Sequence, residues 1–362
     1  MSLDKRIEEL GYEIVMGVET HVQLNTKTKL FCSCDNQEST TPNENICAIC
    51  TGQMGTLPEL NKAAVEKSIV LGAGLNSKTP NLVRWDRKHY QYPDLPKNFQ
   101  LTQLDHPIIE GGHVKCFRDD GSSFNVELDH AHLEEDAGKL IHTDKYSLVD
   151  YNRCGTPLVE IVTEPCLHKI EDAETYAKYI QKIARHLGVS DADMEKGQMR
   201  SDVSVSLRKK GTNDLNPRTE IKNLNSYAYM SKAVTEVVTK QLNHFEKHGI
   251  PSPDQVTAQY DADAQVIKVM RSKEDAADYR FSQEPDIPWL DISDLKERTK
   301  VDISLLPTLV EEELISGGVR PQDAKFFSGD KQRSRVVIGL NEGINDIKSI
   351  ATVLMNNVKP EE

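Results

Sequence analysis

Residues 13–24 read EIVMGVETHVQL and carry the clearest strand signal in the chain. Every second position on one side holds an apolar or small side chain, namely Ile14, Met16, Val18, Thr20, Val22 and Leu24. Glu19 and His21 fall on the alternate positions. Because side chains of a β-strand alternate between two faces, this pattern predicts a strand with one core face and one polar face.

The same alternation recurs in residues 201–208, where Val203, Val205 and Leu207 share one face and Asp202 falls on the other. Apolar residues at helical spacing predict helices over residues 62–75 and 173–187, and from about residue 226 to residue 249. Strands in hairpins mixed with helices favour an α+β fold over a regular βαβ wind.

The chain changes character near its C-terminal end. After Asp291 the sequence turns helical and charged. We therefore expect one main domain over residues 1–291 and a short helical domain over residues 292–362.

Composition limits the class of protein. The chain has 362 residues, with 44 Lys plus Arg and 57 Asp plus Glu, so its formal net charge is −13. An acidic chain lacks the broad basic face that binds nucleic acid by bulk phosphate attraction, so any RNA contact should be local or supplied by a partner. The charged first residues and the short apolar runs predict a cytoplasmic protein without membrane contact.

Four of the seven cysteines form two closely spaced pairs, Cys32 with Cys34 and Cys47 with Cys50. Two such pairs joined by a turn-rich loop are typical of a tetrahedral four-thiolate zinc site, here over residues 32–50. The alternative is that the four thiols are small buried apolar side chains. With no open ligand position, a zinc ion here would be structural.

Carboxylates on predicted strands indicate a second kind of site. Glu19 and His21 lie on the polar face of the first strand, Glu134 and Glu135 follow a histidine in HLEED, and Glu160 lies within the apolar run TPLVEIV. A carboxylate in an apolar strand is costly to bury unless a cation compensates its charge. Hard oxygen ligands on rigid strands suit Mg²⁺ with a nucleotide, and the alternative is a solvated polar face of a sheet.

The absence of two common motifs excludes two kinds of site, and one further motif has two interpretations. The chain has neither a Walker loop nor a Gly-x-Ser-x-Gly elbow, so a P-loop nucleotide site and a serine hydrolase are not expected. Residues 84–93 read RWDRKHYQYP, a basic and aromatic run that suits either an RNA contact or a packed loop.

Taken together, the motifs resemble one family, the B subunit of the tRNA-dependent amidotransferase (GatB). The matching stretches occur in family order over roughly residues 12 to 290. They include GVETHVQL at Gly17, DRKHYQYPDLPKNFQ at Asp86, HLEEDAGKLIH at His132, SLVDYNRCGTPLVEIVTEP at Ser147 and GVSDADMEKGQMRSDVSVSLR at Gly188. KLFCSC, PNENICAIC, TEIKNLNSY and MRSKEDAADYR complete the series.

The resemblance implies a function. The family fold resembles the glutamine synthetase and guanidino kinase catalytic fold, an antiparallel-sheet cradle with flanking helices. The family enzyme is an ATP-dependent carbon–nitrogen ligase that phosphorylates the side-chain carboxylate of misacylated Glu-tRNA(Gln) or Asp-tRNA(Asn), using Mg²⁺. Ammonia, which a separate amidase (the A subunit) releases from glutamine, then displaces the phosphate. A small third protein, the C subunit, holds the other two together.

The resemblance also assigns residues. Its catalytic positions correspond to Glu19, His21, Glu134, Glu135 and Glu160, of which Glu19, His21 and Glu135 are expected to bind Mg²⁺. Its nucleotide or substrate positions correspond to Asp202, Lys222, Asn223 and Asn225. Strand alternation puts Glu134 and Glu135 on opposite faces, so only one of them should be a direct ligand, and we predict Glu135. The four cysteines match the zinc ligands of those members that have them.

Two departures from the family pattern leave alternatives open. Family members usually read DYRYFPEPD, whereas residues 278–286 read DYRFSQEPD. Only 71 residues follow Asp291 (362 − 291), which is too short for both the helical domain and the tRNA-reading tail domain of the family. The alternatives are a non-catalytic RNA-binding or assembly paralogue and a free-standing ligase that uses dissolved ammonia.

Overall fold

The strand predicted first lies near the middle of a large twisted sheet. The computed structural model describes residues 3–250, 254–261, 264–272 and 278–357. Within these, nine strands form one sheet. Two of them, β5 (Ile109–Glu110) and β6 (His113–Phe117), both pair with β7 (Ser123–Glu135). Apart from β6, the strands run in the order β14 (Val266–Ser272), β13 (Val256–Asp261), β12 (Thr219–Leu224), β11 (Met199–Lys209), β1 (Tyr12–Gln23), β10 (Pro157–Thr163), β7 and β5.

The alternation in β1 is confirmed. Ile14, Met16, Val18 and Val22 are buried in the main core, whereas Glu19 and His21 on the other face are only partly buried. β1 pairs antiparallel with β10 on one side and with β11 on the other. The polar positions of three neighbouring strands therefore line one face of the sheet.

The expectation of a wholly antiparallel sheet is wrong at one pair. β12 and β13 run parallel, with Thr219 opposite Val256. Between them the chain forms α4 (Tyr227–His248), which carries the chain back across the sheet, so that β13 points in the same direction as β12. A parallel pair requires such a crossover connection. The architecture is thus mixed α/β with a mixed sheet.

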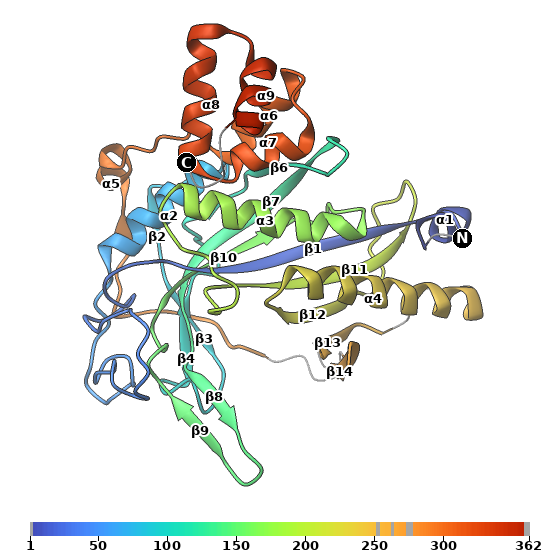
Figure 1. Ribbon diagram of the computed structural model, residues 1–362. Helices are drawn as coiled ribbons and strands as arrows, with labels where there is room; N and C mark the ends of the chain where they lie inside the picture. The colour runs from blue at the N-terminus through green and yellow to red at the C-terminus, as the bar shows by residue number, and fades with distance from the viewer. Residues whose placement is uncertain (1–2, 251–253, 262–263, 273–277, 358–362) are drawn as a thin grey trace.

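The three predicted helices are confirmed, and two of them, α3 (Ile170–His186) and α4, lie side by side over the apolar face of the sheet (Figure 1). Gly249, with a φ of 73°, ends α4 in the left-handed conformation that glycine adopts at low cost. Asn61 caps the third helix, α2 (Lys62–Gly74), by accepting a hydrogen bond from the amide of Ala63.

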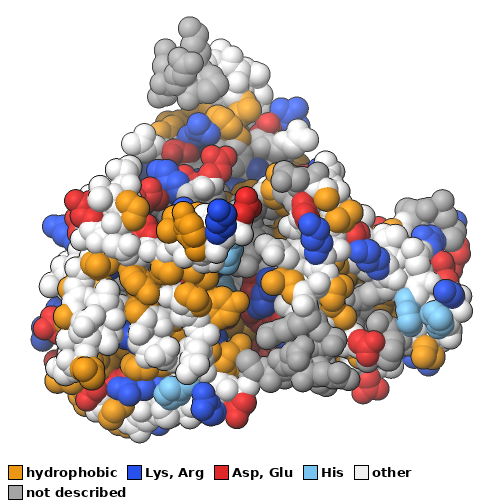
Figure 2. Space-filling model, turned by 90° about the horizontal axis from the view of Figure 1, so that it is seen from below, with side chains coloured by type: hydrophobic (Ala, Val, Ile, Leu, Met, Phe, Trp, Pro, Cys, Tyr) orange, Lys and Arg blue, Asp and Glu red, His pale blue; other side chains and the backbone are white. Residues whose placement is uncertain are grey.

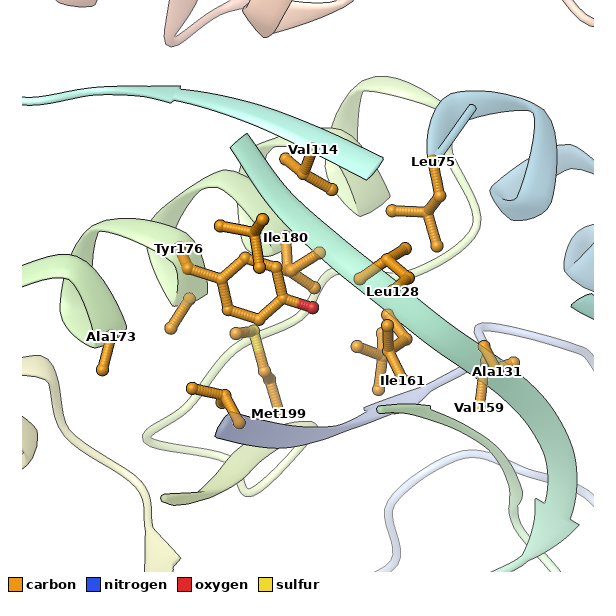
Figure 3. Close-up of a cluster of buried hydrophobic side chains, with 14 of the residues drawn as sticks. Leu75, Val114, Leu128, Ala131, Val159, Ile161, Ala173, Tyr176, Ile180 and Met199 are labelled. Carbon is orange, nitrogen blue, oxygen red and sulfur yellow. The ribbon is translucent and has the colours of Figure 1, made fainter. Parts of the chain in front are cut away.

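Tyr176 of α3 shows how the helices bury their apolar stripes. Its ring lies among aliphatic side chains that come from the sheet and from α3 itself, including Ile161, Ile180 and Met199 (Figure 3). Tyr176 is fully buried. Burial of this apolar ring helps the stripe to hold α3 on the sheet.

Smaller elements surround the sheet. β15 (Ser282–Gln283), β3 (Asp86–His89) and β4 (Phe99–Thr102) form a three-stranded sheet, and β16 (Leu290–Asp291) pairs with β2 (Leu82–Val83). β8 (Lys139–His142) and β9 (Ser147–Asp150) form a hairpin that projects from the body (Figure 1). A short helix, α1 (Leu3–Glu9), precedes β1.

The C-terminal region is helical, as predicted. It comprises α5 (Ser293–Arg298), α6 (Pro307–Ser316), α7 (Pro321–Ser328), α8 (Lys331–Ile344) and α9 (Ile347–Asn357). A second hydrophobic core, which includes Leu314, Phe327 and Val337, lies among α6 to α9. Ile292 and Leu306 still belong to the main core. Among the described residues, no helix combines the length and hydrophobicity needed to cross a bilayer.

Candidate active site

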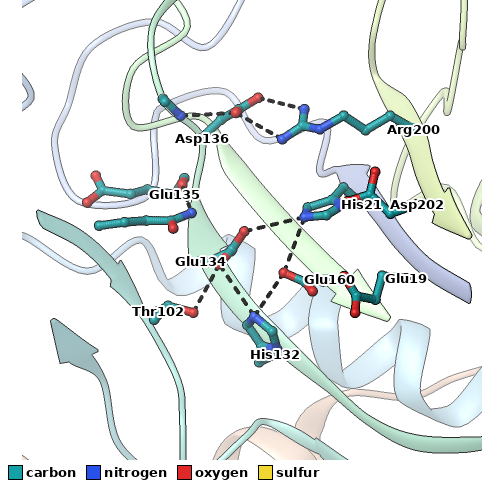
Figure 4. A network of polar contacts seen from close by, with 12 residues as sticks. Glu19, His21, Thr102, His132, Glu134, Glu135, Asp136, Glu160, Arg200 and Asp202 are labelled. Carbon is teal, nitrogen blue, oxygen red and sulfur yellow. Dashed lines mark hydrogen bonds and ion pairs between the residues drawn. The ribbon is translucent and has the colours of Figure 1, made fainter. Parts of the chain in front are cut away.

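The polar face of the sheet gathers acids and histidines from three adjacent strands. His21 of β1 lies opposite Glu160 of β10, and Glu160 lies opposite His132 of β7. Glu134 follows two residues after His132 and therefore shares its face (Figure 4). Seen from below in Figure 2, charged and histidine side chains lie between two groups of hydrophobic side chains.

The first cluster consists of His21, His132, Glu134 and Glu160. The Nε2 atom of His21 lies 3.2 Å from Glu160 Oε2 and 3.9 Å from Glu134 Oε1. The Nε2 atom of His132 lies 3.4 Å from Glu160 Oε2 and 3.4 Å from Glu134 Oε2. Ligand atoms of His21, Glu134 and Glu160 all lie within 4.8 Å of one another, which is close enough to surround one cation.

Two acids facing two histidines stabilise the protonated histidines. Burial opposes the charged form of His132, but hydrogen bonds to Glu134 and Glu160 outweigh it and raise the pKa of His132 to about 10. Burial likewise opposes the charged form of His21, and the charge of Glu160 outweighs it and raises the pKa of His21. Although burial raises the pKa of Glu160, the two histidines lower it well below its ordinary value.

This ion-pair network predicts a pH-dependent stability. Because the pKa of His132 rises from 6.5 to about 10 on folding, its contribution is complete below pH 6.5 and is lost as the pH rises towards 10. We expect His132→Gln to lower the free energy of unfolding by a few kcal/mol at pH 6, but by much less at pH 10. Denaturant titrations in chelator, without magnesium, measure both differences.

A matched control is His142→Gln, since His142 is exposed and its side chain hydrogen-bonds the hydroxyl of Ser147. Its effect on unfolding should be small. An effect of His132→Gln that is no larger at pH 6 than at pH 10 would contradict a charged His132.

A second acidic cluster lies beside the first, on β1, β11 and β12. Ligand atoms of Glu19, Asp202 and Glu220 lie within 4.8 Å of one another. The Nζ atom of Lys222 lies 2.8 Å from Asp202, 2.6 Å from Glu220 and 3.8 Å from Glu19. Burial works against its charge, yet these acids raise the pKa of Lys222, so the ammonium stays protonated.

The two predicted asparagines occupy different places. Asn223 has a positive φ of 59°, and its backbone amide donates a 2.8 Å hydrogen bond to Asp202. This backbone conformation turns the amide toward the second cluster. Asn225 is exposed and lies one residue past the end of β12.

An ion pair borders the first cluster. Arg200, which lies opposite His21 on β11, donates to both carboxylate oxygens of Asp136, at 3.2 Å and 3.3 Å. Burial raises the pKa of Asp136, but Arg200 and Arg153 outweigh burial and lower it. Arg200 is thus held in place at the edge of the polar face.

The structure corrects the prediction for Glu135. Its side chain lies on the other side of β7, away from His21 (Figure 4). There it forms an ion pair with Lys97 and accepts a 3.0 Å hydrogen bond from the amide of Leu101. The predicted grouping of Glu135 with Glu19 and His21 is therefore not found, and Glu134 is the acid that meets His21. The register of β7 against β10 and the packing of β4 on β7 decide which of the two acids faces the cluster.

Substitution of Glu135 should therefore lower the stability of the folded protein. Glu135→Gln leaves the Lys97 ammonium, whose side chain is only 10% exposed, without its carboxylate. Breaking a buried pair on one side costs about 3–5 kcal/mol, which denaturant unfolding would measure. Glu110→Gln is the control, because its partner Lys78 is largely exposed and the pair is worth little. Equal stability of Glu135→Gln and wild type would contradict a buried ion pair.

Sequence reasoning missed four residues of this face: His132, Asp136, Arg200 and Glu220. Three of them stand two residues away from a predicted residue on the same strand, His132 from Glu134, Arg200 from Asp202, and Glu220 from Lys222. Period-two alternation was therefore a usable signal for those three. Asp136 lies past the end of β7, where alternation no longer predicts the direction of a side chain.

The basic and aromatic run over residues 84–93 is partly core. Trp85 is fully buried and donates to the carbonyl of Leu133 at 3.1 Å, and Arg87 pairs with the buried Glu284 at 2.7 Å. Tyr92 is 60% exposed. The first part of the run is thus packed, as one of the two sequence interpretations expected.

The four cysteines of the N-terminal loop come together as predicted. The sulfur atoms of Cys32, Cys34, Cys47 and Cys50 lie within 4.8 Å of one another. The amide of Cys47 donates to Cys50 Sγ at 3.2 Å. The pKa of Cys50 falls to about 5, mainly because Cys32 donates a hydrogen bond to its sulfur. Four thiols in one small cluster fit the tetrahedral ligand set of a structural zinc ion.

Comparison with known proteins identifies the family. The family model described as the GatB/GatE catalytic domain matches residues 14–296. The chain is 42% identical over 287 residues to a protein of Chlamydia abortus that is named as the B subunit of aspartyl/glutamyl-tRNA(Asn/Gln) amidotransferase. The match covers 78% of this chain and 59% of that protein.

Two further relatives with the same name extend the match. One from Carboxydothermus hydrogenoformans is 37% identical over 96% of this chain and 73% of its own length. One from Symbiobacterium thermophilum is 38% identical over 96% of this chain and 72% of its own length. The chain spans about three fifths of the chlamydial relatives it matches, 59% to 62%. With the family model covering residues 14–296, this chain belongs to the GatB/GatE catalytic domain family.

Proposed function

We propose that this chain is the B subunit of a tRNA-dependent amidotransferase and that its polar sheet face activates the substrate. In this proposal, the face phosphorylates the side-chain carboxylate of Glu or Asp carried by a misacylated tRNA, using ATP. The observation that carries the proposal is the pair of adjacent acidic clusters on one sheet face, in a chain of the GatB/GatE catalytic domain family.

The two clusters suit Mg²⁺. His21, once its proton is displaced, would hold one ion together with Glu134 and Glu160, and Glu19, Asp202 and Glu220 would hold a second. Magnesium, when bound, supplies charge neutralisation between ATP and an anionic carboxylate acceptor. Carboxylate oxygens are the ligands this hard cation prefers.

Two positively charged side chains near the clusters would bind the phosphate groups of ATP. Lys222 lies among the acids of the second cluster, and Arg200 is fixed at the edge of the first by Asp136. Both present donors that suit phosphate oxygens. In phosphoryl transfer such fixed positive groups stabilise the charge that spreads over the transferred phosphoryl oxygens.

A neighbouring cavity supports a nucleotide substrate. It has a volume of about 490 Å³, starts at Glu19 and continues past Gly17, Val162 and Ser204. Its lining mixes small, apolar and polar side chains, as small-molecule sites do. In the proposal it receives the nucleoside part of ATP, with the phosphates directed to Lys222 and to the magnesium ion that Glu19 would help to hold.

The family resemblance adds the partners and the second half of the reaction. Ammonia would come from glutamine hydrolysed by the amidase (the A subunit), and the small C subunit would complete the complex. The ammonia would attack the phosphorylated carboxylate and release phosphate. Phosphate activation of a carboxylate is also the chemistry of glutamine synthetase, whose catalytic fold we propose the cradle resembles.

ATP-dependent amidation tests the proposal. The chain would be assembled with the A and C subunits and supplied with Glu-tRNA(Gln) or Asp-tRNA(Asn), ATP, Mg²⁺ and ammonium. Ammonium replaces the amidase step, so the readout depends only on the chemistry proposed for this chain. Formation of Gln-tRNA or Asn-tRNA that requires both ATP and Mg²⁺ is the expected result. A complex that assembles and binds tRNA but forms neither product would favour the non-catalytic paralogue.

A further inference from the structure

Lys29 is a buried cation without a carboxylate partner among the described residues. Its side chain is 0% exposed, although lysine is rarely fully buried unless it is paired. Its Nζ atom donates to the carbonyl of Asn45 at 2.6 Å and to that of Tyr151 at 3.5 Å. Its third contact is the sulfur of Cys50, at 3.8 Å. Two carbonyl dipoles alone do not offset the cost of burying an ammonium ion.

The cysteine cluster supplies the missing negative charge. Four thiolates around one Zn²⁺ carry a net charge of about −2, because each thiolate contributes −1 and the ion +2. Cys50, which Lys29 contacts, is itself buried. The buried ammonium and the partly buried anionic centre therefore compensate each other's charge, which lowers the cost of burying both.

We infer that Lys29 is a positioning residue of the zinc site, which binds Cys50 as a thiolate and compensates the charge of the zinc–thiolate centre. This inference rests on the zinc ion proposed from the four cysteines. Lys29 acts through the ligand and does not touch the metal. Partners of this kind orient metal ligands and tune the affinity of the site.

The same side chain ties the cysteine loop to the sheet. The stem of Lys29 runs past Gly155, where an added Cβ would lie 3.5 Å from Lys29 Cδ. The amide of Leu30 donates to the carbonyl of Gly155 at 2.8 Å, and Cys154 Sγ donates to the carbonyl of Cys50 at 3.3 Å. Gly155 lies two residues before β10, the strand that carries Glu160. The contacts of Lys29, Leu30 and Cys50 together join the metal loop to the start of a strand of the candidate active site.

Zinc transfer to a chromogenic chelator tests the role of Lys29. Lys29→Met keeps much of the stem and removes the charge, whereas Lys29→Arg keeps the charge. Lys27→Met is the matched control, because Lys27 is exposed in the same loop. We expect Lys29→Met to weaken zinc affinity about 10- to 100-fold relative to wild type, the usual effect of losing a partner of a metal ligand, and therefore to release zinc to the chelator faster. Lys29→Arg should lie closer to wild type, and Lys27→Met should match it.

A second measurement separates charge compensation from simple packing. After zinc is stripped, Lys29 faces at most the charge of the Cys50 thiolate, so Lys29→Met should lower the denaturation midpoint by less without zinc than with zinc. A lysine with only a packing role would lower the midpoint by the same amount with and without zinc. If Lys29→Met does not accumulate as folded protein, Lys29→Gln replaces it in both measurements.

The failures of the two proposals can be told apart. Wild-type protein without bound zinc would overturn both the zinc site and the role of Lys29. If wild type binds zinc, and Lys29→Met and Lys27→Met both release it as slowly as wild type, the role of Lys29 alone would be overturned.

Discussion

Glu134→Gln is expected to lower the rate of ATP-dependent amidation by about 10²-fold or more. Gln keeps the size of the side chain and one acceptor oxygen, but it removes the charge that binds a divalent cation. Loss of charge neutralisation between ATP and the carboxylate acceptor removes several kcal/mol of transition-state stabilisation, and each 1.4 kcal/mol is about tenfold in rate. The measurement is product formation by the assembled complex with ammonium supplied directly.

Glu135→Gln is the informative comparison, because it changes the neighbouring residue in the same way on the opposite face of β7. It should lose stability while each folded molecule retains far more activity than Glu134→Gln. Thr102 donates to Glu134 Oε2 at 3.0 Å and should still bind the Gln carbonyl, and Glu160 still pairs with His21 and His132, so Glu134→Gln should remain folded. If Glu135→Gln were inactive and Glu134→Gln active, the assignment of the cluster to Glu134 would be wrong.

Cys47→Ser should remove the zinc ion and loosen the N-terminal loop. Protein purified without added metal is expected to hold close to one zinc per chain, and the variant close to none. A structural zinc contributes on the order of 10 kcal/mol of apparent binding free energy in small metal-folded sites, so its loss exceeds the effect of most single substitutions. Elemental analysis and limited proteolysis of the loop measure the two effects.

Cys166→Ser is the control for that experiment. Cys166 lies outside the cluster and is only partly buried, so its replacement should leave the zinc content unchanged. Wild-type protein without zinc and with all four thiols freely titratable would refute the metal site. The packing interpretation of the four cysteines would then stand.

Local patterns in the sequence were sufficient to predict β1, β11 and the three helices α2, α3 and α4. The alternation in residues 13–24 predicted β1 and its two faces, because the period of a strand depends only on backbone geometry. The helix end at Gly249 was predictable for a similarly local reason, since a glycine cap acts on nearby backbone groups. The cysteine spacing likewise predicted a cluster that the structure contains.

The composition of the candidate site was only partly predictable. Glu19, His21, Glu134 and Glu160 were identified from their strands and from the family motifs, and all four lie on the polar face. Neither source indicated that they divide into two clusters. That division depends on which strands are neighbours, and strand order is a long-range property of the sheet.

The choice between Glu134 and Glu135 shows most clearly what was left to the tertiary structure. By itself, the sequence determined that two consecutive acids on a strand point to opposite faces. Which face meets His21 and which meets Lys97 depended on the pairing of β7 with β10 and on the packing of β4 against its other side. Those contacts join residues far apart in the chain, so no local period can encode them, and a one-residue shift in register would exchange the two acids.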